Sequence, residues 1–209
     1  MYGNQVRKAR GFAGQNGLKI KGCPLAPEAT VKEYLIVQSE ERVDYMLKKE
    51  ELIELIKDAF KDIPYPGDDS IGSDHCWECQ HVADTLRGKR SDEITLEFLI
   101  KDLRESVSIC LLSCEAFQYY LPALLLLIIE NQGQEKIGNW EDRVISILWP
   151  DEPGSQYYDF TVEKYKIFNN QQKHVIRLFL EYLICVNPNE HGYEDSPPKE
   201  ALKNYWNQW

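Results

Sequence analysis

The feature that most constrains the fold is an apolar segment in the middle of the sequence, residues 114–130, which reads CEAFQYYLPALLLLIIE. Ser113 is a good N-cap for a helix through this segment, and the Asn-Gln-Gly at residues 131–133 is typical of a helix end. A helix that is apolar on nearly every side has to be surrounded by other helices. We therefore expect residues 114–130 to form the central helix of the fold, with a kink at Pro122.

Several other segments have apolar residues at steps of three and four, which is the pattern of amphipathic helices. The predicted helices span residues 43–60, 74–86, 96–112, 140–149 and 171–186, and a last one begins at Pro197. Residues 157–169 are expected to be irregular or partly helical. The sequence thus predicts one all-α domain of six to eight helices at residues 31–209, preceded by a basic, glycine-rich arm at residues 1–30.

The net charge of −10 is unevenly distributed along the sequence. Residues 1–24 contain five basic residues and no acidic one, so the remainder is more acidic still. An acidic surface argues against a nucleic-acid coat and favours a basic partner. The arm has three interpretations: a solubilising tail, a segment that docks on an acidic surface of the same molecule or of a neighbour, and a nucleic-acid contact.

The expected location is the cytoplasm. No apolar segment typical of a secretory signal follows the first basic residues. The longest apolar run, Leu121 to Ile129, is far shorter than the roughly 20 residues that span a bilayer. The six cysteines are unevenly spaced, which favours reduced thiols over a disulfide framework.

The stretch from Phe60 to Gly88 is dense in prolines, glycines, acids, histidines and cysteines, the residues that folding alone explains least. Residues 63–69 predict a rigid turn, because two prolines fix φ and Gly67 permits a chain reversal. Asp74 is the expected N-cap of the helix that follows, and Trp77 is expected on its inward face.

Four residues of this stretch form a candidate zinc site. The candidate ligands are His75, Cys76, Cys79 and His81. Cys-x-x-Cys lets two thiolates bind one tetrahedral ion, but a structural site needs a further ligand pair, which would come from Cys110, Cys114 or Cys185. Two alternatives remain: the helix simply buries Cys79, or the pair has a redox role at a helix N-terminus.

A second candidate is a hydrolytic metal site around Asp68, Asp69 and His75. Clustered carboxylates bind magnesium or manganese, and a histidine beside an aspartate can act as a general base. The structural alternative is that aspartates favour turns and helix N-caps for reasons of backbone hydrogen bonding.

Seven residues are candidates for binding a partner or ligand. They are Tyr65, Asp68, Asp69, His75, Glu78, Trp206 and Trp209. The two tryptophans are included because exposed tryptophans are costly unless they are covered. We expect them to dock either on the same molecule or on a partner.

The motifs DIPYPGDD at 62–69, HCWEC at 75–79 and SCEAFQYYLP at 113–122 occur in this order, followed by LFLEYL at 178–183. Together they resemble an uncharacterised family of small acidic bacterial proteins, over about residues 50–206. The resemblance implies an all-helical cytoplasmic domain and no established activity.

No phosphate-binding loop and no Gly-x-Ser-x-Gly nucleophile motif is present in the sequence. The prediction is therefore a non-enzymatic helical protein-binding module, such as a complex subunit, an adaptor or an immunity-type inhibitor, that acts through an acidic surface. Homo-oligomerisation is an equivalent expectation. The alternatives are the metal-dependent hydrolytic enzyme and the nucleic-acid contact through the arm.

Overall fold

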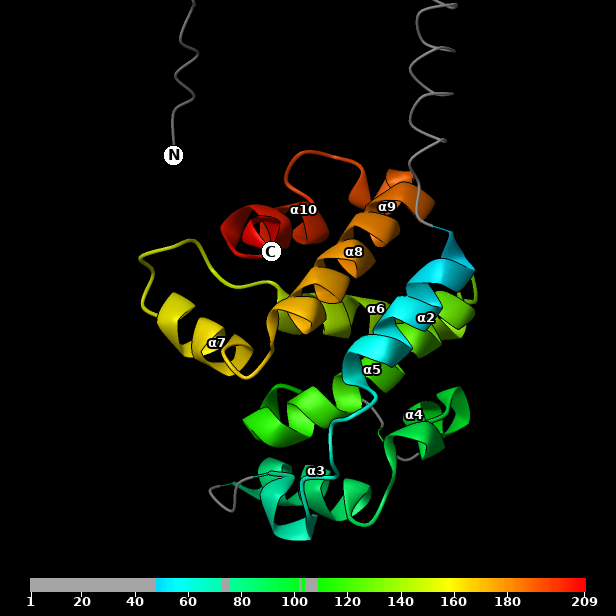
Figure 1. Ribbon diagram of the computed structural model, residues 1–209, viewed down its shortest axis with the longest axis vertical. Coiled ribbons are helices and arrows are strands. Elements are labelled where there is room, and N and C mark those ends of the chain that lie inside the picture. The colour runs from blue at the N-terminus through cyan, green and yellow to red at the C-terminus, as the bar shows by residue number, and fades with distance from the viewer. Residues whose placement is uncertain (1–47, 73–75, 102, 104–108) are drawn as a thin grey trace, which may run out of the picture. The chain divides into compact units, whose positions relative to one another are not determined.

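The computed structural model describes residues 48–72, 76–101, 103 and 109–209 (Figure 1). These residues belong to a unit that begins at Asp44. The predicted arm and its boundary with the helical domain, at residues 30 and 31, lie outside the described residues.

The described residues form nine α-helices and four short 3-10 turns. The helices are α2 (Lys49–Phe60), α3 (Trp77–Leu86), α4 (Leu96–Lys101), α5 (Cys114–Glu130), α6 (Glu135–Leu148), α7 (Tyr158–Tyr165), α8 (Asn170–Val186), α9 (Pro188–His191) and α10 (Pro197–Asn204). The 3-10 turns are η1 (Asp68–Ser70), η2 (Ser91–Glu93), η3 (Ile109–Leu111) and η4 (Trp206–Gln208). The predicted all-α class is confirmed, and the extra helix is the short α9, where the sequence predicted only a helix end.

Helix α5 begins at the residue that its cap predicts, because the Ser113 hydroxyl accepts a hydrogen bond of 3.0 Å from the amide of Ala116. The helix contacts α2 and α6 and is not broken at Pro122. One stripe of it, from Tyr119 to Leu127, is only half-buried and lines a shallow groove beside α2. The central position of α5 is therefore as expected, but its enclosure by other helices is incomplete.

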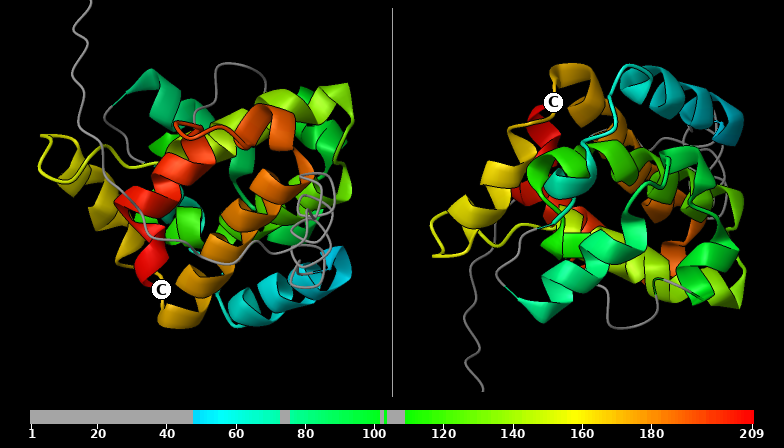
Figure 2. Two further views of the ribbon diagram at one scale, coloured as in Figure 1. Left: turned by 90° about the horizontal axis from the view of Figure 1, so that it is seen from above. Right: turned by 90° about the horizontal axis from the view of Figure 1, so that it is seen from below.

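Helices α2 and α8 pack side by side, and α2 also lies against α5 (Figures 1 and 2). Gln172 in the first turn of α8 is fully buried, and its side-chain amide donates to the carbonyl of Ala59 at 3.1 Å. Its amide oxygen accepts from the side chain of Gln118 on α5 at 2.9 Å. This one side chain therefore ties three helices together.

The C-terminal tryptophans dock on the molecule itself. Trp206 is fully buried, and its indole N–H donates to the carbonyl of Leu148 at 2.6 Å. The ammonium of Lys173 lies 3.7 Å from the ring centre of Trp209. We expected these residues to dock either on the same molecule or on a partner, and in the structure they dock on the same molecule. Trp206 therefore presents no surface to a partner.

The predicted helix 96–112 is wrong as one continuous helix. Helix α4 ends at Lys101, the described Leu103 is not helical, and the described residues at 109–111 form the turn η3. The reason is tertiary. Leu112 forms an isolated antiparallel bridge with Gly72, and the Ser113 amide donates to the carbonyl of Ile71 at 3.0 Å, so this segment pairs with the turn before α3.

The start and the inward face of α3 also differ from the prediction. Asp74 lies outside the described residues, and Cys76 occupies the N-cap position, where its sulfur accepts from the amide of Cys79. Trp77 is 70% exposed and not inward-facing, since Cys79 and the residues at helical spacing after it fill the buried face.

None of the helices in the described ranges combines the length and the apolar character that crossing a bilayer needs.

Candidate functional site

The turn at residues 63–69 is fastened to the end of α3. The Tyr65 hydroxyl donates to a carboxylate oxygen of Asp68 at 2.5 Å, and the amide of Gly88 donates to the same oxygen at 3.0 Å. These hydrogen bonds lower the pKa of Asp68, the one from Tyr65 most, and burial raises the pKa of Tyr65. Gly67 has the positive φ of 87° that the reversal requires. Tyr65 and Asp68 therefore have a structural task that explains much of the DIPYPGDD motif.

The hydrolytic set is not assembled in the described residues. Asp69 is exposed and lines a shallow hollow with Asp84 and Arg87, which themselves form an ion pair of 3.1 Å. Asp68 is engaged in the turn, and His75 lies outside the described residues. The hydrolytic site stays a prediction, and the geometry of the two aspartates is that of turn residues.

The predicted zinc ligands lie at the start of α3. Cys76 and Cys79 are joined in a disulfide, with their Cα atoms 5.2 Å apart, in place of the expected reduced thiols. A disulfide offers no thiolate, so zinc binding by this pair requires its reduction. His81 is exposed, and its ring stacks on Trp77 with 5.6 Å between the ring centres. Zinc binding stays a prediction, with its fourth ligand, His75, outside the described residues.

Glu78, between the two cysteines, lines a groove among the described residues. This groove of about 650 Å³ is formed by α3, η3, α5, α6 and α7, which can be followed in Figure 1. Its lining residues are Glu78, Ile109, Cys110, Phe117, Asp142, Arg143, Ser146, Ile147, Trp149, Phe160, Thr161, Lys164 and Tyr165. Of the predicted binding residues that the structure describes, Glu78 alone lines it.

Two large exposed aromatic side chains line this groove, and two more are close in sequence to its lining residues. Trp149 and Phe160 line it and are 41% and 75% exposed. Trp77 precedes Glu78 at the α3 side and is 70% exposed, and Tyr157 is 62% exposed. Tyr157 lies one helical turn before Phe160 and Thr161, so it belongs to the same side of α7. Exposed aromatic side chains gathered around a hollow mark a binding surface.

Lys164 supplies a cation inside the groove. Its ammonium donates to the carbonyl of Cys110 and lies 5.9 Å from the ring centre of Phe117. Among the residues that the structure describes, no carboxylate forms an ion pair with it. Burial lowers the pKa of Lys164, because the charged form loses hydration, and the neighbouring thiols of Cys110 and Cys114 oppose this shift only in part. The groove therefore offers an incompletely compensated positive charge beside apolar walls.

Arg143 and Asp142 line the same groove from α6. The guanidinium of Arg143 lies 5.0 Å from the ring centre of Trp140, so the arginine is held against an aromatic face. The groove thus combines two cations, from α6 and α7, with carboxylates of Glu78 and Asp142 near its rim. This mixture suits polar and apolar groups of another protein better than a purely apolar ligand.

Sequence reasoning missed the groove because its residues come from five separate elements. A partial signal exists for Trp149 and Phe160, which are large apolar residues outside the predicted helical stripes. Nothing in the local sequence distinguishes Lys164 from the other surface lysines, since its burial depends on η3 and α5.

The fold and the groove define an all-α domain with one aromatic-rimmed hollow and no recognisable catalytic set among its described residues. Residues 48–209 match the family of unknown function DUF6714, and the protein belongs to this family. The expected membership of an uncharacterised family is thereby confirmed, with the arm outside the matched range. No curated protein and no solved structure matches the sequence.

Proposed function

We propose that this protein is a non-enzymatic, cytoplasmic protein-binding module whose groove holds a segment of its partner. The exposed aromatic side chains around the groove carry the proposal. Trp77, Trp149, Tyr157 and Phe160 are four of the six large hydrophobic side chains that are exposed among the described residues. Leaving an aromatic side chain in water forgoes about 1.5–3 kcal/mol of burial, and tryptophan and tyrosine are the residues that anchor protein interfaces.

The partner segment is expected to place a carboxylate beside an apolar side chain. The carboxylate would pair with Lys164, which forms no ion pair with a carboxylate among the described residues. The apolar group would fill the space between Trp149 and Phe160. An aspartate, a glutamate or a C-terminal carboxylate next to a large apolar residue has this chemistry.

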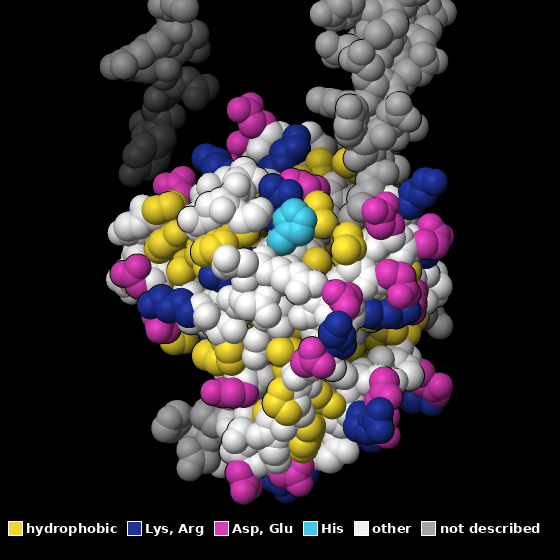
Figure 3. Space-filling model, in the orientation of Figure 1, with side chains coloured by type: hydrophobic (Ala, Val, Ile, Leu, Met, Phe, Trp, Pro, Cys, Tyr) yellow, Lys and Arg dark blue, Asp and Glu magenta, His cyan; other side chains and the backbone are white. Residues whose placement is uncertain are grey.

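The acidic character of the protein acts at longer range. The net charge of −10 favours approach of a partner whose surface is basic around the binding segment. On the face drawn in Figure 3, acidic and basic side chains alternate and do not separate into one acidic patch. The groove is therefore the better candidate for specificity, and the overall charge for the rate of association.

A display library of random 12-residue peptides, selected on the purified full-length protein, tests the proposal. The enriched peptides are expected to share an apolar or aromatic residue within two positions of a carboxylate. Each is expected to lose affinity for the variants Phe160→Ala and Lys164→Met, because each variant removes one half of the recognition.

Tyr193→Ala is the matched control, since Tyr193 is a large side chain that is 54% exposed and does not line the groove. It should bind the selected peptides like the unaltered protein. Absence of any enriched peptide, or peptides that bind all three variants equally, would show that the groove is not the binding surface.

A further inference from the structure

Helix α6 buries a carboxylate on its inward face. Glu141 is 5% exposed and follows Ile137 and Trp140 on the apolar side of the helix. Its two oxygens accept hydrogen bonds from the side-chain amides of Gln132, at 3.1 Å, and Asn187, at 3.0 Å. Burying a carboxylate is costly unless it is hydrogen-bonded. The side-chain amides of Gln132 and Asn187 hold the Glu141 carboxylate in position from two directions.

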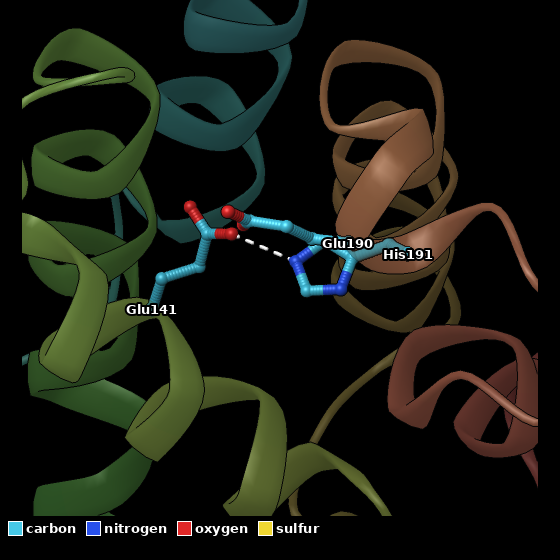
Figure 4. A group of neighbouring side chains, drawn as sticks. All are labelled: Glu141, Glu190 and His191. Atoms are coloured by element: carbon cyan, nitrogen blue, oxygen red, sulfur yellow. Dashed lines mark hydrogen bonds and ion pairs between the residues drawn. The ribbon is translucent and has the colours of Figure 1, made fainter.

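A histidine from α9 points at the same carboxylate. His191 is 5% exposed, and its Nε2 lies 2.8 Å from Oε1 of Glu141 (Figure 4). Its other ring nitrogen, Nδ1, is buried and has no hydrogen-bond partner within the described residues. The Glu141 carboxylate only accepts hydrogen bonds, so Nε2 carries the ring proton in this contact. Because Nδ1 has no partner among the described residues, the ring can carry its proton there when Nε2 binds an ion.

Glu190 completes the group from the solvent side. It precedes His191 on α9 and is exposed, and Figure 4 shows its carboxylate beside that of Glu141. One ligand atom of each of the three residues lies within 4.8 Å of the other two. Two carboxylates this close repel each other unless a positive charge lies between them.

We propose that Glu141, Glu190 and His191 form a binding site for a divalent metal ion, with Mn²⁺ as the ion that its two carboxylates and single imidazole suit best. Atoms that bind one ion at about 2.1 Å lie at most about 4.2 Å apart. The group therefore has to contract by up to about 0.6 Å, which rotation of the exposed Glu190 side chain provides. The ion takes the place of the hydrogen bond between Nε2 and Glu141 and displaces the proton from Nε2.

The amides of Gln132 and Asn187 orient the buried ligand as outer-shell partners do in metal sites. The exposed side of Glu190 leaves room for water molecules as the remaining ligands and gives the ion a route in. The bound ion links α6 to α9. Glu141 and His191, its ligands from these two helices, are 50 residues apart in the sequence. This site is separate from the groove and does not depend on the proposed binding of a partner.

Manganese titration of the full-length protein, followed by the loss of the EPR signal of free Mn²⁺, tests the site. Manganese prefers oxygen and nitrogen ligands, so the protein's thiols compete little for it. One ion is expected to bind per molecule below about 1 mM free manganese. Glu190→Gln should weaken binding at least about tenfold, the loss that even an outer-shell partner causes. Because Glu190 is exposed, this variant should keep the melting temperature of the metal-free protein.

Glu152→Gln is the matched control, since it makes the same charge change at an exposed position away from the group. It should bind manganese like the unaltered protein. Backbone amide NMR locates the ion, because Mn²⁺ broadens the signals near it. Broadening is expected around Gln132, Glu141 and residues 187–191. Broadening around Asp68, Asp69 and Asp84 instead, equal binding by the two variants, or no binding below about 1 mM would overturn the proposal.

Discussion

Substitution of Phe160 is expected to affect the stability of the fold and the proposed peptide binding very differently. The side chain is 75% exposed, so only about a quarter of it is covered by the protein. Full burial of a phenylalanine is worth about 1.5–3 kcal/mol, and a quarter of that is about 0.4–0.8 kcal/mol. Phe160→Ala should therefore lower the free energy of unfolding by less than about 1 kcal/mol. A side chain that contributes so little to the fold is free to serve an interface.

The same substitution should have a large effect on peptide binding. Residues that anchor an interface cost at least about 2 kcal/mol when they are truncated, which corresponds to roughly a thirtyfold loss of affinity. For Phe160→Ala we expect a loss of this size for peptides selected on the groove. Phe160→Ala would thus change the free energy of unfolding little and the affinity for peptides strongly.

Trp206→Ala provides the contrasting case. Trp206 is fully buried against Tyr165 and Tyr205 and donates a hydrogen bond to the carbonyl of Leu148. Truncation of a buried tryptophan costs about 3–5 kcal/mol. The lost hydrogen bond leaves a carbonyl without its partner, which adds to the cost.

Denaturant unfolding followed by far-UV circular dichroism measures both variants without relying on the fluorescence of the tryptophan that is removed. A cost of about 2 kcal/mol or more for Phe160→Ala, roughly twice its expected upper bound, would mean that Phe160 is packed in the fold, and the argument for an exposed aromatic rim would fail. A cost below about 1 kcal/mol for Trp206→Ala would contradict the burial of the C-terminal turn.

Three further outcomes are expected. Burial lowers the pKa of Lys164, so stability should rise as pH increases through the window between that pKa and the ordinary value of 10.5, and thermal melts of Lys164→Met should lack this contribution. The pKa of Asp68 is lowered, so its contribution to stability is present above the ordinary value of 3.8 and is lost as pH falls through the folded-state pKa. Asp68→Asn should therefore be less stable than the unaltered protein at neutral pH, and thermal melts at decreasing pH should show this difference shrink. Tyr120→Phe removes the buried hydroxyl that donates to the carbonyls of Leu86 and Lys89, and it should cost about 1–3 kcal/mol in denaturant unfolding.

The parts of the fold that could be predicted from the sequence are those with local signals. Helix α5 follows from its apolar composition and from Ser113, whose side chain makes the predicted cap. Helix α8 begins one residue before the predicted position. Its cap is a reciprocal pair in which Asn169 accepts from the amide of Gln172 and Gln172 accepts from the amide of Asn169. Caps and apolar stripes act within a few residues, so a sequence displays them directly.

The parts that could not be predicted depend on contacts between distant residues. The apolar spacing before residue 112 is helical, but hydrogen bonds from Ser113 to Ser70 and Ile71 draw that segment into contact with the turn before α3. The role of Asp68 also depends on a contact with a distant residue. Its residue type suits a metal site as well as a turn, and only the amide of Gly88, twenty residues later, shows that the turn uses it.

Glu141 shows what a sequence signal can and cannot carry. A carboxylate at an inward position of an otherwise apolar helical stripe is visible from spacing alone, because Ile137 and Ile145 lie one turn on either side. Such a residue must find buried donors, since an unpaired carboxylate in the interior costs several kcal/mol. The pattern thus predicts that partners exist. It does not identify them, because Asn187 lies at the α8–α9 junction and His191 at the end of α9, both distant from α6 in the sequence. A carboxylate on an apolar stripe is therefore a reason to search the folded structure for its partners, and here that search leads to a group with the donors of a metal site.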